Sequence, residues 1–263
     1  MSKDIIFITV PKLDPNMPIV GPALLKSQLR ENGFSSVYMD FNIYLYNQME
    51  DCRELWWGDE HPCWLDLDLL IEDYGTKLKE PTFSFAKDVL KHNPKWIGIT
   101  QFSTTSQAPS ILLIKAFKEL GYKGKFVLGG PSCMLFHSET PIIKMVDHVI
   151  YGEAEESLIE LLEGKTSGPG IDTKNFKQLQ NLDKYPFPDY TDLRLKEYSS
   201  NGSVLYMASS RGCVRNCTFC DIHAMAPKFK FRSGKLMAEE VMHQSLRHPT
   251  VNVMRWADSL FNG

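Results

Sequence analysis

The chain has 263 residues, of which 29 are basic and 32 acidic, giving a formal net charge of −3. This balance provides no basic face of the kind that nucleic acid binding requires, so we expect no nucleic acid partner. The N-terminal apolar run DIIFITV is too short for a signal sequence or a membrane span, which predicts a cytoplasmic protein without membrane contact. Six cysteines without a secretory signal favour metal or redox chemistry over a disulfide framework.

Buried strands alternate with amphipathic helices through residues 1–165. The isoleucine-rich run at 4–10 has the continuous apolar character of a strand that is covered on both faces. Further strands are expected at 36–41, 96–102, 125–130 and 148–153, and helices at 21–33, 110–121 and 154–165, with a short one near 138–145. This alternation predicts the α/β class, with a doubly wound parallel sheet in a Rossmann-like N-terminal domain.

Residues 46–90 interrupt the alternation with an acidic, tryptophan-rich segment. We predict a helical insertion after the second strand. Aromatic side chains mostly fill cores, so we expect Trp56, Trp57 and Trp64 to pack the insertion onto the sheet. The alternative is that they surround a large planar ligand.

The composition changes at residues 166–200, where glycine and proline are frequent and no periodicity is evident. We predict a linker there, leading to a second region at 201–263. That region contains an expected strand at 203–209, a cysteine-rich loop, a helix at 234–248 and a strand at 251–258, which is the opening of an α/β barrel. Because a full barrel takes roughly 250 residues, we expect the chain to stop within it and to leave a barrel edge exposed.

Three cysteines, Cys213, Cys217 and Cys220, lie within RGCVRNCTFC in a C-x3-C-x2-C spacing. A zinc site needs four ligands, and His223 is the available fourth. A redox pair made of Cys217 and Cys220 would leave Cys213 unexplained. A 4Fe–4S cluster uses all three thiolates and leaves one iron open to a substrate or cofactor.

The stretch CVRNCTFC, with Phe219 just before its last cysteine, resembles the signature of the radical S-adenosylmethionine superfamily. The resemblance implies that the three cysteines hold the cluster and that S-adenosylmethionine chelates the open iron. Reductive cleavage would then give a 5′-deoxyadenosyl radical. An enzyme of this kind needs an electron donor such as flavodoxin or ferredoxin and acts on a small-molecule or natural-product-like substrate.

The same resemblance implies further cofactor contacts in this second region. Phe219 would lie near the adenine, and Asp258 and Ser259, in RWADSLFN, would hold the methionine moiety. Arg232 and Ser233 match a frequent R-S pair before the first barrel helix. From the residues alone, Asp258 is equally a helix cap, Ser233 the N-cap of the helix and Arg232 the partner of a surface carboxylate.

The N-terminal domain resembles the cobalamin-binding domain of the cobalamin-dependent class of this superfamily, through PIVGPALLKSQLRENG, VLGGPS and YGEAEESLIELL. Ligands of such sheets bind beyond the carboxyl ends of the strands. The residues expected there are Ser103, Thr104, Thr105, Gly129, Gly130, Gly152 and Glu153. The loop PKLDPNMPIVG lacks the histidine of the D-x-H-x-x-G motif, so cobalt would have no histidine ligand from it.

The leading hypothesis is therefore a radical S-adenosylmethionine enzyme with a 4Fe–4S cluster and cobalamin, which carries out methyl transfer or another C–H modification. The first alternative is a non-catalytic fragment that binds cobalamin or a cluster and needs a partner chain. The second is a zinc-stabilised binding module.

Overall fold

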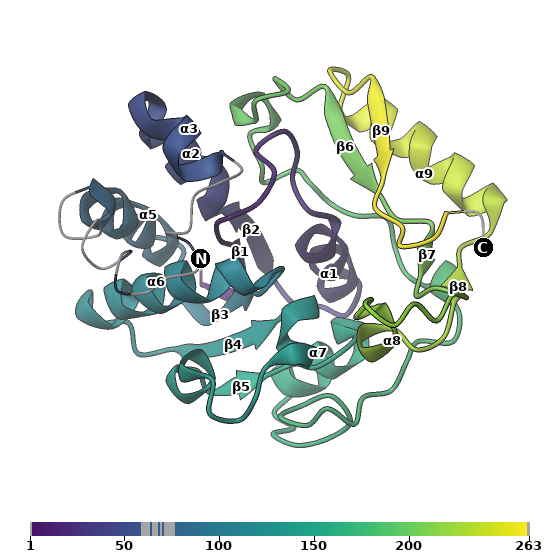
Figure 1. The fold of residues 1–263 in the computed structure, drawn as a ribbon, viewed down its shortest axis with the longest axis horizontal. Coiled ribbons are helices and arrows are strands. Elements are labelled where there is room, and N and C mark those ends of the chain that lie inside the picture. The colour runs from purple at the N-terminus through teal and green to yellow at the C-terminus, as the bar shows by residue number, and fades with distance from the viewer. Residues whose placement is uncertain (1, 59–63, 65–67, 69, 71–76, 262–263) are drawn as a thin grey trace.

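A five-stranded parallel sheet forms the N-terminal part of the chain (Figure 1). The computed structural model describes residues 2–58, 64, 68, 70 and 77–261. The strands are ordered β2-β1-β3-β4-β5, with bounds β1 Lys3–Thr9, β2 Ser36–Asp40, β3 Pro94–Thr100, β4 Lys125–Gly129 and β5 His148–Val149. The predicted α/β fold class with a doubly wound parallel sheet is confirmed.

The register gathers the carboxyl ends of the inner strands. Thr9 pairs with Asp40 on one side and with Thr100 on the other, and Thr100 pairs with Gly129. The strand order reverses between β1 and β3, which makes that edge the topological switch point at which such sheets bind ligands.

Helices cover both faces of the sheet. One face carries α2 (Phe41–Gln48), α3 (Arg53–Trp57), α5 (Lys79–Leu90) and α6 (Gln107–Glu119), and the other carries α1 (Val20–Glu31) and α7 (Ala154–Leu162). Strand β1 serves both cores because its side chains alternate. Ile6 and Ile8 lie in the core under α5 and α6, whereas Ile5 and Phe7 lie in the core under α1 and α7.

The tryptophan-rich insertion packs as expected where it is described. Trp56 and Trp64 are fully buried, with ring centroids 5.0 Å apart, and Trp64 Nε1 donates to the Trp56 carbonyl at 2.5 Å. Trp57 Nε1 donates to Asn42 Oδ1 at 3.0 Å. These aromatic side chains belong to the core and its rim, whereas residues 59–63, 65–67, 69 and 71–76 lie outside the described part.

Short 3-10 helices occupy several connections: η1 (Glu50–Cys52), η4 (Thr104–Ser106), η5 (Pro131–Leu135), η6 (Pro141–Met145), η7 (Leu182–Lys184) and η8 (Leu195–Glu197). The helix expected near 138–145 is thus the 3-10 turn η6. The segment predicted as a linker is well packed, because Tyr190 and Tyr198 are buried in the core under α1.

The C-terminal part contains a β-α-β unit. Strands β6 (Val204–Met207) and β9 (Val253–Trp256) pair in parallel, and α9 (Gly234–Arg247) connects them. The Ser233 side chain caps α9 by accepting from Leu236 N at 3.3 Å, as the N-cap alternative predicts. Figure 1 places this unit beside the N-terminal sheet. Within the described part of the chain, no helix has the length and the apolar character needed to cross a bilayer.

Candidate cofactor site

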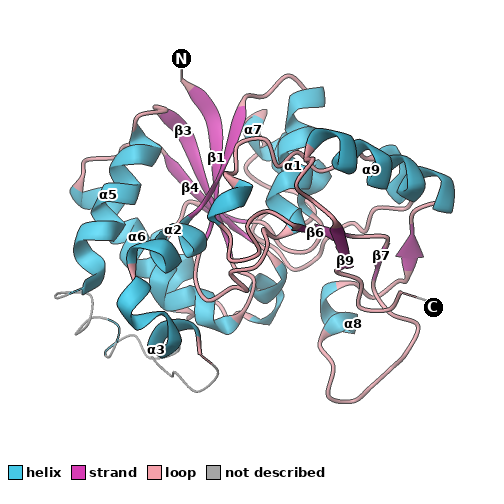
Figure 2. Cartoon of the chain, turned by 90° about the horizontal axis from the view of Figure 1, so that it is seen from above, coloured by secondary structure: helices cyan, strands magenta, loops and turns pink. Residues whose placement is uncertain are grey.

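The three motif cysteines lie on one loop, residues 212–229, which we call the cysteine loop (Figure 2). A short antiparallel ladder closes its base, formed by β7 (Ser210–Arg211) and β8 (Lys230–Phe231). Gly212 opens the loop with φ +78°, and a Cβ there would lie 2.6 Å from the Lys228 carbonyl oxygen. The motif therefore begins in a tight turn that only glycine accommodates.

The cysteine thiols are accessible. Cys217 and Cys220 are exposed and Cys213 is half-buried, all three as free thiols. The Arg215 backbone N–H donates to Cys213 Sγ at 3.3 Å, the kind of hydrogen bond that tunes thiolate ligands of iron–sulfur clusters. Among the residues that the structure describes, no three His, Cys, Asp or Glu side chains come together to hold a metal ion, so the three thiols share a loop without converging on one point. The donor set, three thiols on one loop, fits an iron–sulfur cluster.

The zinc alternative depends on His223, which lies in the short helix α8 (Ile222–Met225) inside the cysteine loop. Its Nε2 atom contacts the Arg215 carbonyl oxygen. The structure therefore directs the Nε2 atom of this imidazole to the backbone of the loop.

The cysteine loop lies beside the carboxyl end of the sheet. Helix α8 packs against η5, the turn that follows Gly129 and Gly130 at the end of β4 (Figure 1). Phe219 is 88% exposed, which leaves its ring free to contact a ligand. Phe102, which follows β3, is also exposed. The fold thus brings the cysteine motif and the strand ends of the Rossmann-like part to one side of the molecule.

The residues after β3 and β4 divide into open and packed positions. A Cβ on Gly129 would meet no atom within 4 Å, whereas a Cβ on Gly130, at φ +106°, would lie 2.6 Å from the Gln101 carbonyl oxygen. Ser103 and Thr105 share a hydrogen bond of 2.5 Å between their hydroxyls, and Thr104 is exposed. The open space at Gly129 and the hydroxyls at 103–105 fit the approach of a bulky ligand.

Gly152 and Glu153 differ from the sequence-based expectation. A Cβ on Gly152 would lie 2.2 Å from the Phe176 ring, so this glycine serves close packing. Glu153 accepts hydrogen bonds from Leu179 N at 2.6 Å, Arg211 Nη1 at 3.0 Å and Lys230 Nζ at 2.9 Å. The Glu153 carboxylate therefore binds groups of the protein, two of which belong to the base of the cysteine loop.

Asp258 also has a structural partner set. Its Oδ1 accepts from the backbone N–H groups of Ser209 and Ser210, at 2.8 and 2.6 Å, and its Oδ2 accepts from Ser209 Oγ at 2.6 Å. The Asp258 carboxylate therefore fixes the segment that joins β6 to β7 and leads into the cysteine motif. In this role Asp258 is not a helix cap, and both of its carboxylate oxygens accept hydrogen bonds from the protein. Ser259 beside it is exposed.

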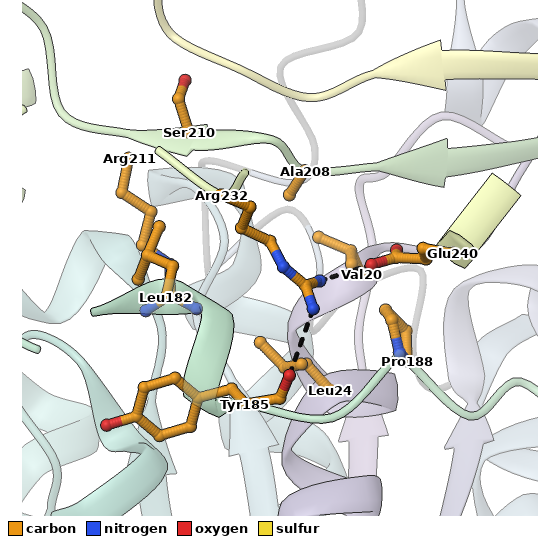
Figure 3. A pocket seen from close by; sticks show the side chains of 10 residues that line it. All are labelled: Val20, Leu24, Leu182, Tyr185, Pro188, Ala208, Ser210, Arg211, Arg232 and Glu240. Atoms are coloured by element: carbon orange, nitrogen blue, oxygen red, sulfur yellow. Dashed lines mark hydrogen bonds and ion pairs between the residues drawn. The ribbon is translucent and has the colours of Figure 1, made fainter. Parts of the chain in front are cut away.

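Arg232, which the resemblance places at a cofactor, is buried and is held by protein groups (Figure 3). Its guanidinium pairs with Glu240, donates to the Tyr185 carbonyl at 3.1 Å and lies 5.5 Å from the Phe187 ring centroid. Burial raises the pKa of Glu240 to about 7 although the Arg232 charge opposes the shift. The adjoining cavity, between α1 and α9, measures about 20 Å³ and accommodates about one water molecule.

Sequence reasoning missed Glu155, Arg211 and Lys230 as partners at the loop base. Arg211 Nη2 contacts Glu155 Oε1, and Lys230 contacts Glu153. The available signal was the placement of a cation at each end of the cysteine loop and of carboxylates in the stretch YGEAEE.

No model of a known protein family matches the chain. An anaerobic magnesium-protoporphyrin IX monomethyl ester cyclase from Synechocystis sp. is 21% identical over 222 residues, which are 73% of this chain and 44% of that protein. A solved structure of the radical S-adenosylmethionine methyltransferase TsrM from Kitasatospora setae, with tryptophan substrate and a S-adenosylmethionine analogue bound, aligns with a TM-score of 0.62. The alignment has 14% identity and covers 98% of this chain and 48% of that one.

The chain therefore shares its fold with the corresponding half of this methyltransferase. A second TsrM structure, with cobalamin and a [4Fe–4S] cluster bound, aligns with a TM-score of 0.60 and 15% identity over 100% of this chain and 48% of that chain. The chain thus spans about half the length of the proteins that it resembles.

Proposed function

We propose that this chain belongs to a radical S-adenosylmethionine enzyme and binds a 4Fe–4S cluster through Cys213, Cys217 and Cys220. The observation that supports this is the accessible three-thiol loop, closed at its base and placed beside the carboxyl edge of a doubly wound sheet. When bound, the cluster supplies the single electron that cleaves S-adenosylmethionine. An electron donor such as flavodoxin or ferredoxin would reduce it.

Four further residues in and beside the cysteine loop would support the loop or contact S-adenosylmethionine. Gly212 sets the turn into the motif, and Asp258 fixes the two serines before it. The exposed ring of Phe219 is available to the adenine, and the exposed Ser259 to the methionine moiety. Binding of the cluster would draw together three sulfurs that share a loop.

We also propose that cobalamin binds at the carboxyl edge of the sheet. The open space at Gly129 admits a bulky group, and the hydroxyls of residues 103–105 offer hydrogen-bond partners. The loop after β1 lacks histidine. Residues 166–200 hold this loop in place, because Ser199 N donates to the Pro15 carbonyl at 2.9 Å. Cobalt would therefore have no histidine ligand from this loop. The expected reaction is methyl transfer or another C–H modification of a small molecule.

Iron and sulfide analysis after anaerobic reconstitution tests the cluster. We expect about four iron and four sulfide ions per chain. Replacing any one of the three motif cysteines by alanine should reduce both strongly, because each thiolate holds one corner.

Cys133→Ala is the matched control for this experiment. Cys133 is fully buried in the core, and burial raises the pKa of its thiol to about 12, so we expect this cysteine to contribute nothing to the cluster. Cys52 and Cys63 are also expected to be dispensable; Cys63 and the side chain of Cys52 lie outside the described residues. Zinc without iron in the wild type, or iron retained in the triple alanine variant, would refute the cluster.

A further inference from the structure

Four charged side chains meet where the base of the cysteine loop contacts the N-terminal part. Glu153 and Glu155 face Arg211 and Lys230, so the charges balance. Arg211 Nη1 lies 3.0 Å from Glu153 Oε1, Arg211 Nη2 contacts Glu155, and Lys230 Nζ lies 2.9 Å from Glu153 Oε2. We call this cluster the latch.

The latch is largely withdrawn from water. The exposed fractions of the side chains are 6% for Glu153, 5% for Glu155, 10% for Lys230 and 26% for Arg211. Burial alone would raise the pKa of Glu155, but the Arg211 guanidinium outweighs it and lowers that pKa. Separating such a pair strands a buried charge, which is far more costly than breaking a surface ion pair.

The latch contacts both ends of the cysteine loop. Arg211 directly precedes residues 212–229 and Lys230 directly follows them, and the two residues pair across the β7–β8 ladder. A ladder of two residues per strand is too short to be stable by itself. The ion pairs therefore act together with the Asp258 contacts to Ser209 and Ser210 in keeping the two ends of the loop in place.

On the other side, the carboxylates come from the start of α7. Glu153 occupies the N-cap position of this helix, but its side chain makes no capping hydrogen bond and turns to the two cations instead. Glu155 lies in the first turn. Since α7 directly follows β5 in the chain, the latch fixes the cysteine loop to the sheet.

We propose that Glu153 and Glu155 are positioning residues, which hold the cysteine loop in place against the N-terminal domain through Arg211 and Lys230. The positioning of a cluster by this latch rests on the proposed function. The clamping of the loop itself does not.

Hydrogen exchange followed by mass spectrometry on the full chain without cluster tests the clamping. The variant is the double substitution Glu153→Gln and Glu155→Gln, which keeps the side-chain shapes and removes both charges. We expect amide exchange in residues 209–211 and 230–232 to accelerate more than tenfold, including the Arg232 amide that donates to the Ser209 carbonyl at 2.7 Å. Exchange in β1 and β3 should stay at the wild-type rate.

The matched control is Glu160→Gln, on the same helix α7. Glu160 pairs with Lys165 at 3.2 Å on the surface, so its loss should leave exchange at the loop base unchanged. Lys230→Met is a milder second variant. It keeps the contacts of Arg211 with both glutamates, and it should accelerate exchange in 230–232 more than in 209–211.

The g-values of the reduced cluster, measured on the reconstituted wild type and double variant, distinguish a positioning role from a contact that only stabilises the fold. We expect the double variant to take up less than half the wild-type iron and to show altered g-values in the electron paramagnetic resonance spectrum of the reduced cluster. Unchanged exchange at the loop base in both variants, or acceleration spread equally over β1 and β3, would overturn the latch. Wild-type g-values and iron content in the double variant would overturn its positioning role. Absence of iron in the wild type would instead refute the proposed function and leave the exchange result standing.

Discussion

Asp189→Asn should destabilise the chain in a pH-dependent way, because Asp189 clamps the segment after the N-terminal domain onto α1. Its side chain is 7% exposed and lies 2.5 Å from Arg30 Nη1 and 3.4 Å from Lys26 Nζ. Thr191 donates to it from the backbone at 2.9 Å and from its hydroxyl at 2.5 Å. Burial would raise the pKa of Asp189, but these hydrogen bonds and the two cations lower it from 3.8 to about 2.

The magnitude follows from the shift. A fall of the Asp189 pKa from 3.8 to about 2, at about 1.4 kcal/mol per pKa unit, corresponds to about 2–3 kcal/mol of unfolding free energy. Because the pKa of Asp189 is lower in the folded chain than in the unfolded one, this contribution is fully present above about pH 4. It is lost as the pH falls toward 2, and about half of it remains at pH 3.

Urea unfolding of the wild type and Asp189→Asn between pH 7 and pH 3 measures this contribution. The variant should be less stable by about 2 kcal/mol at pH 7, and the gap should narrow to about half at pH 3. Asp88→Asn is the control, since the exposed pair of Asp88 with Lys91 should contribute less than about 1 kcal/mol. A stability difference that stays constant between pH 7 and pH 3 would show that the ionised Asp189 carboxylate does not stabilise the folded chain.

Three further perturbations probe the site. Gly130→Ala should lower the unfolding free energy by at least about 1–2 kcal/mol, because of its positive φ and the backbone contact at Gln101. Gly129→Ala should leave thermal unfolding unchanged and weaken co-elution of hydroxocobalamin with the chain; unaltered co-elution would place cobalamin elsewhere. Asp258→Ala should cost about 3 kcal/mol in urea unfolding, since it leaves two backbone N–H groups without their acceptor; a cost below about 0.5 kcal/mol would contradict that role. Hydroxocobalamin bound to the full chain and reduced to cobalt(II) should show no histidine nitrogen hyperfine splitting, and its appearance would contradict the ligation proposed for the loop after β1.

The alternation of apolar strands and amphipathic helices was enough to predict the sheet, because each strand buries both faces and each helix one. The period of the apolar residues and the lengths of the apolar runs also predicted the β-α-β unit around α9. The strand expected at 148–153 is only two residues long, because the next residues pair outside the sheet: Ile150 forms a bridge with Ile171, and Tyr151 N donates to the Gly170 carbonyl at 2.8 Å.

The site was predictable only in part. The spacing of the three cysteines identified the loop from local sequence, whereas the partners of Glu153 and Asp258 are distant in the chain. Glu153 meets Arg211 across 58 positions and Asp258 meets Ser209 across 49. Nothing in the local pattern distinguishes a carboxylate that holds such a contact from one that faces a ligand. The burial of Tyr190, within the segment predicted as a linker, likewise depends on packing against α1, which is distant in the chain.

We propose that the cysteine loop holds a 4Fe–4S cluster with one iron open to S-adenosylmethionine. Electron paramagnetic resonance of the reconstituted, reduced full chain, recorded with and without saturating S-adenosylmethionine, tests whether that iron is open. We expect the g-values to shift on addition, and we expect S-adenosylmethionine labelled with ¹⁵N at its amino group to give a hyperfine coupling to the cluster. An iron–sulfur spectrum that stays unchanged, without such a coupling, would contradict the open iron.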